Sequence, residues 1–290
     1  MHVRVVAALV IAALGTVAVL LSPTSDARAG EAGAPAVIAH RGASAYAPEN
    51  TLAAIDKAAQ LGLSWVENDV QRTKDGQLVV IHDDSLRRTT NVKDVYPGRA
   101  PWKVKDFTAA EIARLDAGSW FSPAYAGTRI PTLERYMRRV EHNHEKLLLE
   151  LKSPELYPGI EQQTLRLLGK EGWLDRGHLG RLIVQSFSSD SVRTVHDLEP
   201  EVTTAYLGTP SVAQLHDYAR FSDLINPPYG ALSKGYVAAV QTFKGPHGRQ
   251  LGVFAWTVND AATAREVAAY GVDGMITNKP DVVRSAVASG

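Results

Sequence analysis

The chain contains an ordered series of histidines, carboxylates and basic residues, each placed at the end of a short apolar run. The segments are residues 40–42 (HRG), 48–51 (PENT), 67–69 (END), 82–83 (HD) and 150–152 (ELK). Histidine accepts and donates protons near neutral pH, whereas carboxylates and cations bind metal ions and phosphate groups. This pattern is typical of an active site assembled where several strands end.

Three of the acidic residues in these segments can converge on one point. Glu67 and Asp69 are two positions apart at a predicted strand end, so their side chains point to the same face. Glu150 ends another predicted strand and supplies a third carboxylate. Three carboxylates that face one point repel one another unless a hard divalent cation neutralises them. The pattern predicts a metal site; the alternative is three surface carboxylates beside strand ends.

The elements that must position these residues form a regular alternation of strand-like and helix-like segments. Eight apolar runs are predicted strands, at residues 36–39, 65–70, 146–151, 182–186, 203–207, 224–226, 252–257 and 274–277. Helix signals follow Thr51, Thr132 and Asp260 and run to positions 60, 145 and 270. Although 290 residues would also suffice for two modest domains, the alternation predicts one α/β domain, a (β/α)8 TIM barrel, whose chemistry gathers at the C-terminal strand ends.

Two segments interrupt this alternation. Residues 78–81 add a strand-like run, and residues 85–129 carry many polar, aromatic, glycine and proline residues. We interpret the second segment as a small insertion after the second strand region, and long loops above a barrel often cover or shape the substrate site. Its aromatic residues either line that site or, as the simpler role, pack the insertion against the barrel; they are Trp102, Trp120, Phe121 and Tyr125.

Taken in order, these motifs resemble the glycerophosphodiester phosphodiesterase family, in which an HRG…PENT opening, an E-x-D pair, an HD pair and an E-x-K follow one another. The resemblance extends from Val37 to about Val283. It includes residues 185–187 (QSF), 256–259 (WTVN) and 271–274 (GVDG). It therefore covers nearly all of the chain beyond the first segment and implies the same barrel fold.

The resemblance implies a metal-dependent hydrolase with two catalytic histidines. It makes Glu67, Asp69 and Glu150 the protein ligands of one divalent cation, Mg²⁺ or Ca²⁺, since ligation by oxygen alone favours hard ions. It makes His40 and His82 the acid/base pair. Cleavage of a phosphodiester must activate an attacking hydroxyl and protonate a departing alkoxide, which requires both roles.

Two basic residues are predicted to hold the phosphate. The guanidinium of Arg41 can form a bidentate pair, and the ammonium of Lys152 adds a point charge close to the metal. Together they would offset the charge that develops during the reaction. For Lys152 a structural ion pair with a neighbouring carboxylate is the alternative.

Three further positions have weaker assignments. Glu49 is expected to contact substrate hydroxyls or the histidines, or only to order the PENT turn. Trp256 is expected to stack its indole on the glycerol or alcohol moiety, and Asn259 to bond the loop backbone. The family commonly ends in T-D-x-P, whereas residues 277–280 here read TNKP. This loss of an acid weakens a catalytic role for Asn278 but leaves the metal and histidine positions intact.

The composition excludes several classes of protein and partner. The formal net charge is zero and the basic residues are scattered, so no electrostatic footprint for nucleic acid or an anionic bilayer is present. A small-molecule substrate is the expected partner, and the oligomeric state is left open. The chain has no cysteine, which excludes disulfides, thiolate metal sites and cysteine nucleophiles.

The first residues predict export. Arg4 precedes an apolar run from Val5 to Leu21, and small residues surround a cleavage point after Ala29. Residues 1–29 are therefore a predicted signal peptide, 30–35 a linker and 36–290 the catalytic domain. The alternative is an uncleaved membrane anchor, because the apolar run is only a little shorter than the roughly 20 residues that span a bilayer. With cleavage, the protein is secreted and has no stable membrane partner.

The predicted reaction gives glycerol 3-phosphate and an alcohol, either through a cyclic phosphate or by direct attack of water. Two related enzyme classes would use the same kind of barrel: a lysophospholipase-D-like enzyme and a hydrolase of glycerol-phosphate polymers such as teichoic acid. An open apolar groove in the insertion would favour the lipid, and a narrow polar cup the small diester. A phosphodiester-binding protein without turnover would be expected to have lost a histidine or a metal carboxylate, and none is lost.

Overall fold

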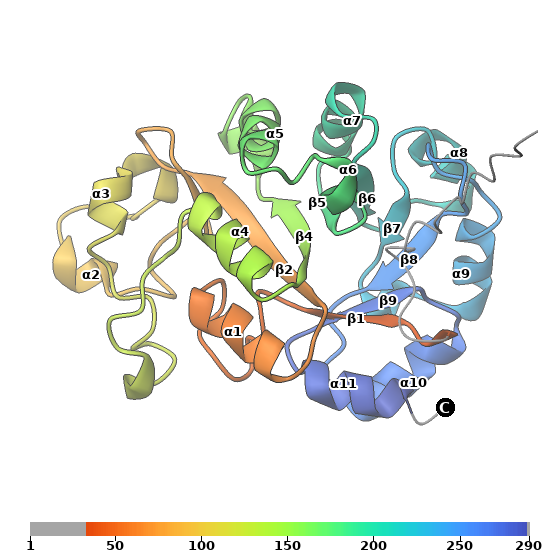
Figure 1. Cartoon of the computed structure of the whole chain (residues 1–290), viewed down its shortest axis with the longest axis horizontal. Helices are drawn as coiled ribbons and strands as arrows, with labels where there is room; N and C mark the ends of the chain where they lie inside the picture. The colour runs from red at the N-terminus through yellow and green to blue at the C-terminus, as the bar shows by residue number, and fades with distance from the viewer. Residues whose placement is uncertain (1–32, 289–290) are drawn as a thin grey trace, which may run out of the picture.

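The computed structural model describes residues 33–288, and in this range eight parallel strands form a closed barrel (Figure 1). β1 pairs with β9 on one side and with β2 on the other, which closes the sheet. The strands are β1 (Ala36–Ala39), β2 (Trp65–Arg72), β4 (Lys146–Leu151), β5 (Leu182–Ser186), β6 (Thr203–Leu207), β7 (Leu224–Asn226), β8 (Gly252–Ala255) and β9 (Gly274–Thr277). The predicted TIM barrel is confirmed.

Buried apolar side chains fill the barrel interior, so the barrel is a packed core and not a pore. One cluster contains residues from every parallel strand, among them Ile38, Leu148, Ile183, Leu224 and Phe254. A substrate can therefore reach the barrel only at its ends.

Helices follow the strands and cover the outside of the barrel (Figure 1). They are α1 (Leu52–Gln60), α4 (Leu133–His142), α5 (Ile160–Lys170), α6 (Arg176–Leu179), α7 (Ser189–Leu198), α8 (Leu215–Tyr218), α9 (Lys234–Val240), α10 (Ala261–Ala269) and α11 (Pro280–Val287). Thr51, Thr132 and Asp260 cap α1, α4 and α10 by accepting hydrogen bonds from backbone N–H groups of the first turn. These three helices begin where the sequence predicts.

Five predicted boundaries differ from the structure. β2 continues to Arg72, beyond the predicted end at residue 70, the strand-like run predicted at 78–81 ends at Val80, and α10 ends at Ala269 and not at Tyr270. α4 ends at His142 and not at Glu145, because His144 adopts a left-handed backbone (φ 57°) that a helix cannot contain. β8 ends at Ala255 and not at Thr257, and beyond it Trp256 forms only an isolated parallel bridge with Pro228.

The insertion, residues 85–129, carries its own small core. The strand β3 (Leu78–Val80) pairs antiparallel with β2 and leads into it. The helical segments of the insertion are α2 (Val92–Val95), η2 (Val104–Asp106), α3 (Ala109–Ile112) and η3 (Pro123–Tyr125). In Figure 1, α2 and α3 lie to one side of the barrel. Leu86, Phe107 and Leu115 are fully buried in this core, which packs on Val79 of β3.

The aromatic residues of the insertion contribute to its packing. Phe121 contacts the rings of both Trp120 and Tyr125 edge to face, and the hydroxyl of Tyr125 donates to Tyr46 O. Trp102 donates through Nε1 to the carbonyl of a neighbouring residue. Of these contacts, the hydrogen bond of Tyr125 joins the insertion to the barrel, as expected, whereas the others lie within the insertion.

The predicted signal peptide, residues 1–29, lies outside the described residues, as does most of the linker. Among the helices of residues 33–288, none has the length and apolar character needed to cross a bilayer.

Gly42 of the HRG motif allows the first strand to meet α1. Its φ is +76°, and a Cβ atom added to it would lie 2.6 Å from Ala54 C and Cβ. We expect Gly42→Ala to lower the free energy of unfolding by about 2–5 kcal/mol, the sum of left-handed strain and overpacking. Gly76→Ala is the control, because a Cβ atom added at Gly76 (φ +88°) would have no neighbour within 4 Å. This substitution should lower the free energy of unfolding by only about 1–2 kcal/mol. Equal losses in urea denaturation would contradict the steric explanation.

Candidate active site

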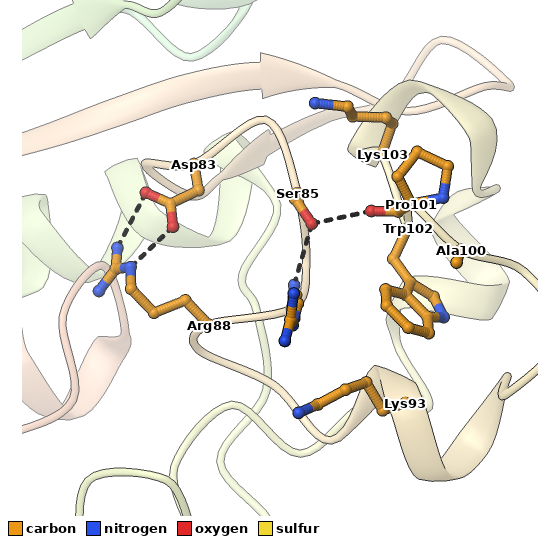
Figure 2. A pocket seen from close by; sticks show the side chains of 9 residues that line it. Asp83, Ser85, Arg88, Lys93, Ala100, Pro101, Trp102 and Lys103 are labelled. Atoms are coloured by element: carbon orange, nitrogen blue, oxygen red, sulfur yellow. Dashed lines mark hydrogen bonds and ion pairs between the residues drawn. The ribbon is translucent and has the colours of Figure 1, made fainter.

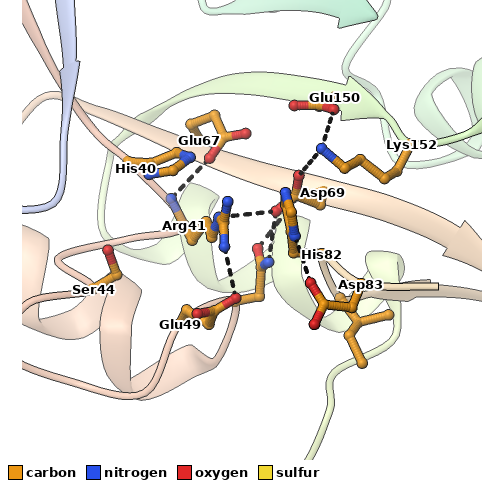
Figure 3. Close-up of polar contacts among 12 residues, drawn as sticks. His40, Arg41, Ser44, Glu49, Glu67, Asp69, His82, Asp83, Glu150 and Lys152 are labelled. Carbon is orange, nitrogen blue, oxygen red and sulfur yellow. Dashed lines mark hydrogen bonds and ion pairs between the residues drawn. The ribbon is translucent and has the colours of Figure 1, made fainter. Parts of the chain in front are cut away.

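Apart from Trp256, the predicted site residues come together at the C-terminal ends of the first strands (Figure 3). His40 and Arg41 directly follow β1, Glu67 and Asp69 lie on β2, and His82 follows β3. Glu150 lies on β4, Lys152 directly follows it, and Trp256 directly follows β8. A cavity of about 80 Å³ opens among them. Its lining includes His40, Arg41, Glu67, His82, Glu150, Lys152 and Trp256.

The three carboxylates form one buried cluster. Asp69 lies opposite Glu150 in the register of β2 and β4, and Glu67 is two residues before Asp69 on the same face. One oxygen from each of the three lies within 4.8 Å of the others. All three residues are buried, with exposed fractions of 4% or less.

The cluster holds more negative charge than its surroundings neutralise. Burial, together with Asp69 and Glu150, raises the pKa of Glu67 well above its usual range. Burial and Asp69 raise the pKa of Glu150 to about 7. Burial also opposes ionisation of Asp69, but Arg41 and Lys152 outweigh it and lower the pKa of that carboxyl. Asp69 is thus the anionic centre of the cluster.

These residues fit a hard divalent cation. Asp69 Oδ1 is buried and accepts no hydrogen bond, so a lone pair is free at the centre of the cluster. The donor set is oxygen alone, which suits Mg²⁺ or Ca²⁺. A bound cation would also favour the ionised forms of Glu67 and Glu150, which burial disfavours.

Arg41 connects the cluster to the PENT segment. Its left-handed backbone (φ 58°) directs its N–H at Glu67 Oε2, 2.8 Å away. Its side chain donates to Glu49 Oε1 at 2.9 Å and lies 3.5 Å from Asp69 Oδ2. The amide of Asn50 donates to the same Asp69 oxygen at 2.8 Å. The PENT segment therefore fixes both the guanidinium of Arg41 and the carboxylate of Asp69.

Lys152 lies between two of the carboxylates. Its Nζ is 2.7 Å from Glu150 Oε1 and 3.6 Å from Asp69 Oδ1, so it makes the ion pair named as its alternative role. It also lies over the ring of Phe187, 5.2 Å from the centroid, and that ring meets Trp256 edge to face. The ammonium thus has carboxylates on one side and an aromatic wall on the other.

His40 is buried and held in one tautomer. Its Nδ1 is 2.6 Å from Asn278 Oδ1, and because an amide oxygen only accepts, Nδ1 carries the proton. Nε2 is therefore left as the acceptor. Burial, and then the neighbouring Arg41, lower the pKa of His40 to about 4, so this imidazole is neutral near pH 7.

His82 is held by a chain of charged groups. Its Nδ1 is 2.7 Å from Asp83 Oδ1, and Arg88 donates to both oxygens of Asp83. The same guanidinium donates to both oxygens of Glu49 at 2.8 Å. Arg88 therefore connects the loop that carries His82 to the segment that holds Arg41.

Sequence reasoning missed several of these supporting residues. The amide of Gln71 on β2 donates to three successive carbonyls, those of residues 81–83, and so fixes the loop of His82. Arg88 and Asn278 were not assigned a role either. Glu49 does not line the cavity and instead holds Arg41 and Arg88. Asn259 accepts a hydrogen bond from the N–H of Asn278, a loop-backbone contact of the expected kind.

The sequence is similar to a known protein family and to individual proteins named as its members. The chain matches the glycerophosphoryl diester phosphodiesterase family over residues 40–282. The Bacillus subtilis protein YhdW is 40% identical over 252 residues, which are 85% of this chain and 96% of that protein. A glycerophosphodiester phosphodiesterase of the same organism is 36% identical over 293 residues, with 95% of each chain covered.

A solved structure shares both sequence and fold. It is a phosphodiesterase of Oleispira antarctica in complex with the product sn-glycerol-3-phosphate, with a TM-score of 0.76 and 30% identity. The likeness covers 88% of this chain and 97% of that one. The chain therefore belongs to the glycerophosphoryl diester phosphodiesterase family and is an enzyme of this class.

Proposed function

We propose that this enzyme cleaves small glycerophosphodiesters to glycerol 3-phosphate and an alcohol, using a divalent cation at Glu67, Asp69 and Glu150. The observation that carries the proposal is the buried carboxylate cluster flanked by two cations and two oriented histidines. The small cavity of about 80 Å³ favours a small diester over a lipid-tailed one.

The two histidines divide the proton transfers. Nε2 of His40, left unprotonated by the bond to Asn278, accepts the proton of the attacking hydroxyl, which belongs to water or to the glycerol moiety. His82, held through Asp83, then gives a proton to the departing alkoxide. Each imidazole is fixed at Nδ1 by a neighbouring side chain and faces the cavity.

The phosphate of the substrate lies between the side chains of Arg41 and Lys152. Arg41 offers a planar guanidinium and Lys152 an ammonium, and both line the cavity. A divalent cation, when bound to the carboxylates, supplies a Lewis acid that polarises a phosphoryl oxygen. The wall of Phe187 and Trp256 is available to the apolar face of the alcohol or glycerol.

The first test is release of glycerol 3-phosphate from glycerophosphocholine. The protein is assayed with a chelator and then with added Mg²⁺ or Ca²⁺. We expect the chelator to abolish release and one cation to restore it. Release that continues at full rate in excess chelator would remove the metal from the proposal, and no release with any cation would contradict the small-diester substrate.

Glu150 is the ligand whose removal is simplest to interpret. We expect Glu150→Gln to weaken the affinity for Mg²⁺ or Ca²⁺ by at least about tenfold, because one charged oxygen ligand becomes a neutral amide. Glu155→Gln, at an exposed position on the following turn, is the matched control. Calorimetric titration of both variants measures the effect, and equal affinities would take Glu150 out of the ligand set.

Export of the enzyme is also part of the proposal. The apolar run of residues 5–21 and the small residues around Ala29 support a cleaved signal peptide and a secreted enzyme. We expect mass spectrometry of the protein recovered from the medium to show an N-terminus near Gly30. An intact Met1 in the membrane fraction would instead indicate an anchor.

A further inference from the structure

The insertion carries a second pocket, with a volume of about 810 Å³ (Figure 2). Its wall is formed by the loop after β3, by α2 and by the segment before η2. The side chains that matter for its chemistry are Arg87, Arg88, Lys93, Lys103, Trp102 and Asp83. Four of these six are cationic, and only one is acidic.

Two of the four cations are already neutralised. Arg88 is held by Asp83 at 2.7 Å and by Glu49 at 2.8 Å. Lys103 lies 2.5 Å from Asp84 Oδ2. These pairs fix the shape of the wall but leave little of their charge for a ligand.

The other two cations are exposed and unpaired. Arg87 and Lys93 have no ion-pair partner among residues 33–288, and both are solvent-exposed in the wall of the pocket. Two unpaired cations in a concave surface attract an anion, and the attraction is strongest for a multiply charged one. The pocket is thus suited to a phosphate group.

The pocket adjoins the catalytic histidine. Asp83 lines the pocket and also binds Nδ1 of His82. Arg88 lines it as well and reaches Glu49, which holds Arg41 in the catalytic cavity. The pocket therefore lies on the Nδ1 side of His82, next to the side chains that orient the catalytic groups. In the proposed mechanism His82 protonates the departing alcohol, so this is the alcohol side of the substrate.

We propose that the pocket binds a second phosphate, carried by the alcohol portion of the diester. This proposal rests on the proposed function, since it assigns the direction in which the substrate lies. Arg87 and Lys93 bind the second phosphate, and the indole of Trp102, fixed by its bond to Tyr96 O, presents apolar surface to the carbon atoms between the phosphates. A phosphorylated head group and the next unit of a glycerol-phosphate chain share this chemistry.

The test compares the activity of the mature enzyme on three substrates. Glycerophosphoglycerol has one phosphate. The same compound with a phosphate monoester on its terminal hydroxyl has two phosphates. A trimer of glycerol joined by two phosphodiesters also has two phosphates, both of them diesters. We expect Arg87→Gln/Lys93→Gln to lower kcat/KM about tenfold for two-phosphate substrates and to leave glycerophosphoglycerol unchanged. A loss confined to the monoester indicates a phosphorylated head group, and a loss with the trimer indicates a polymer chain.

A charge-matched control separates the pocket from the general field of the protein. Arg135→Gln/Arg265→Gln removes two exposed charges from α4 and α10, outside the pocket, and should change none of the three values. An equal loss with all three substrates, or no loss with any of them, overturns the proposal.

Binding measurements keep this proposal separable from the proposed function. If the wild-type enzyme cleaves none of the substrates, the proposed function fails, but calorimetric titration with the phosphate monoester in chelator still tests the pocket. We expect the Arg87→Gln/Lys93→Gln variant to bind this compound about tenfold more weakly than wild type. Equal affinity of the two proteins overturns the pocket assignment.

Discussion

His40→Ala and His82→Ala are each expected to lower kcat by about 10²–10⁴-fold, the contribution typical of a positioned acid or base. Both residues line the catalytic cavity, and each is oriented at Nδ1 by a partner that leaves the other nitrogen free. Neither is a member of the carboxylate cluster. The measurement is steady-state kinetics on glycerophosphocholine with saturating cation, and metal affinity should stay close to that of wild type.

The control for these variants is His216→Ala. The side chain of His216 is 78% exposed on α8, so its removal should leave kcat unchanged. Thermal unfolding of all three variants distinguishes lost catalysis from lost folding. Rates like those of wild type in both His40→Ala and His82→Ala would remove the acid/base assignment.

A substrate with a better leaving group tells the two roles apart. The p-nitrophenyl ester of glycerol 3-phosphate releases a phenolate that needs no proton. We expect this substrate to recover much of the rate in His82→Ala, which lacks the acid, and little in His40→Ala, which lacks the base. Recovery in His40→Ala alone would reverse the assignment.

The barrel and the core of its site follow from local patterns in the sequence. Alternating apolar runs predict the strands, and the spacing of Glu67 and Asp69 places both on one face of a strand. Their meeting with Glu150 depends on the register of β2 against β4, which brings Asp69 opposite Glu150. Spacing along the chain does not encode register between separate strands, so the resemblance supplied that part of the prediction.

The supporting residues were harder to predict because they act across long separations. Asn278 binds His40 although 238 positions separate them, and only closure of the barrel between β1 and β9 brings them together. Gln71 looks like an ordinary strand residue, yet its amide holds the loop of His82. The cationic pocket was missed because its charges are spread over residues 87–103, and the fold of the insertion collects them on one wall.

Asn278 is the position where this chain departs from the common family ending, and the structure gives it a positioning role. Its Oδ1 fixes the tautomer of His40 and also accepts a hydrogen bond from the hydroxyl of Ser44. We expect Asn278→Leu to lower kcat by about 100-fold, because an imidazole without this partner samples the wrong tautomer and orientation. KM should change little, since Asn278 does not line the cavity.

Asn278→Asp is the variant that separates orientation from simple packing. A carboxylate also accepts the proton of Nδ1, so most of the lost kcat should return. The added negative charge favours the imidazolium and raises the pKa of His40 from its value of about 4. A base works only when unprotonated, so the acid limb of the pH profile of kcat/KM should move to higher pH. If Asn278→Asp is as slow as Asn278→Leu, or if the acid limb stays in place, His40 does not depend on Asn278 in this way.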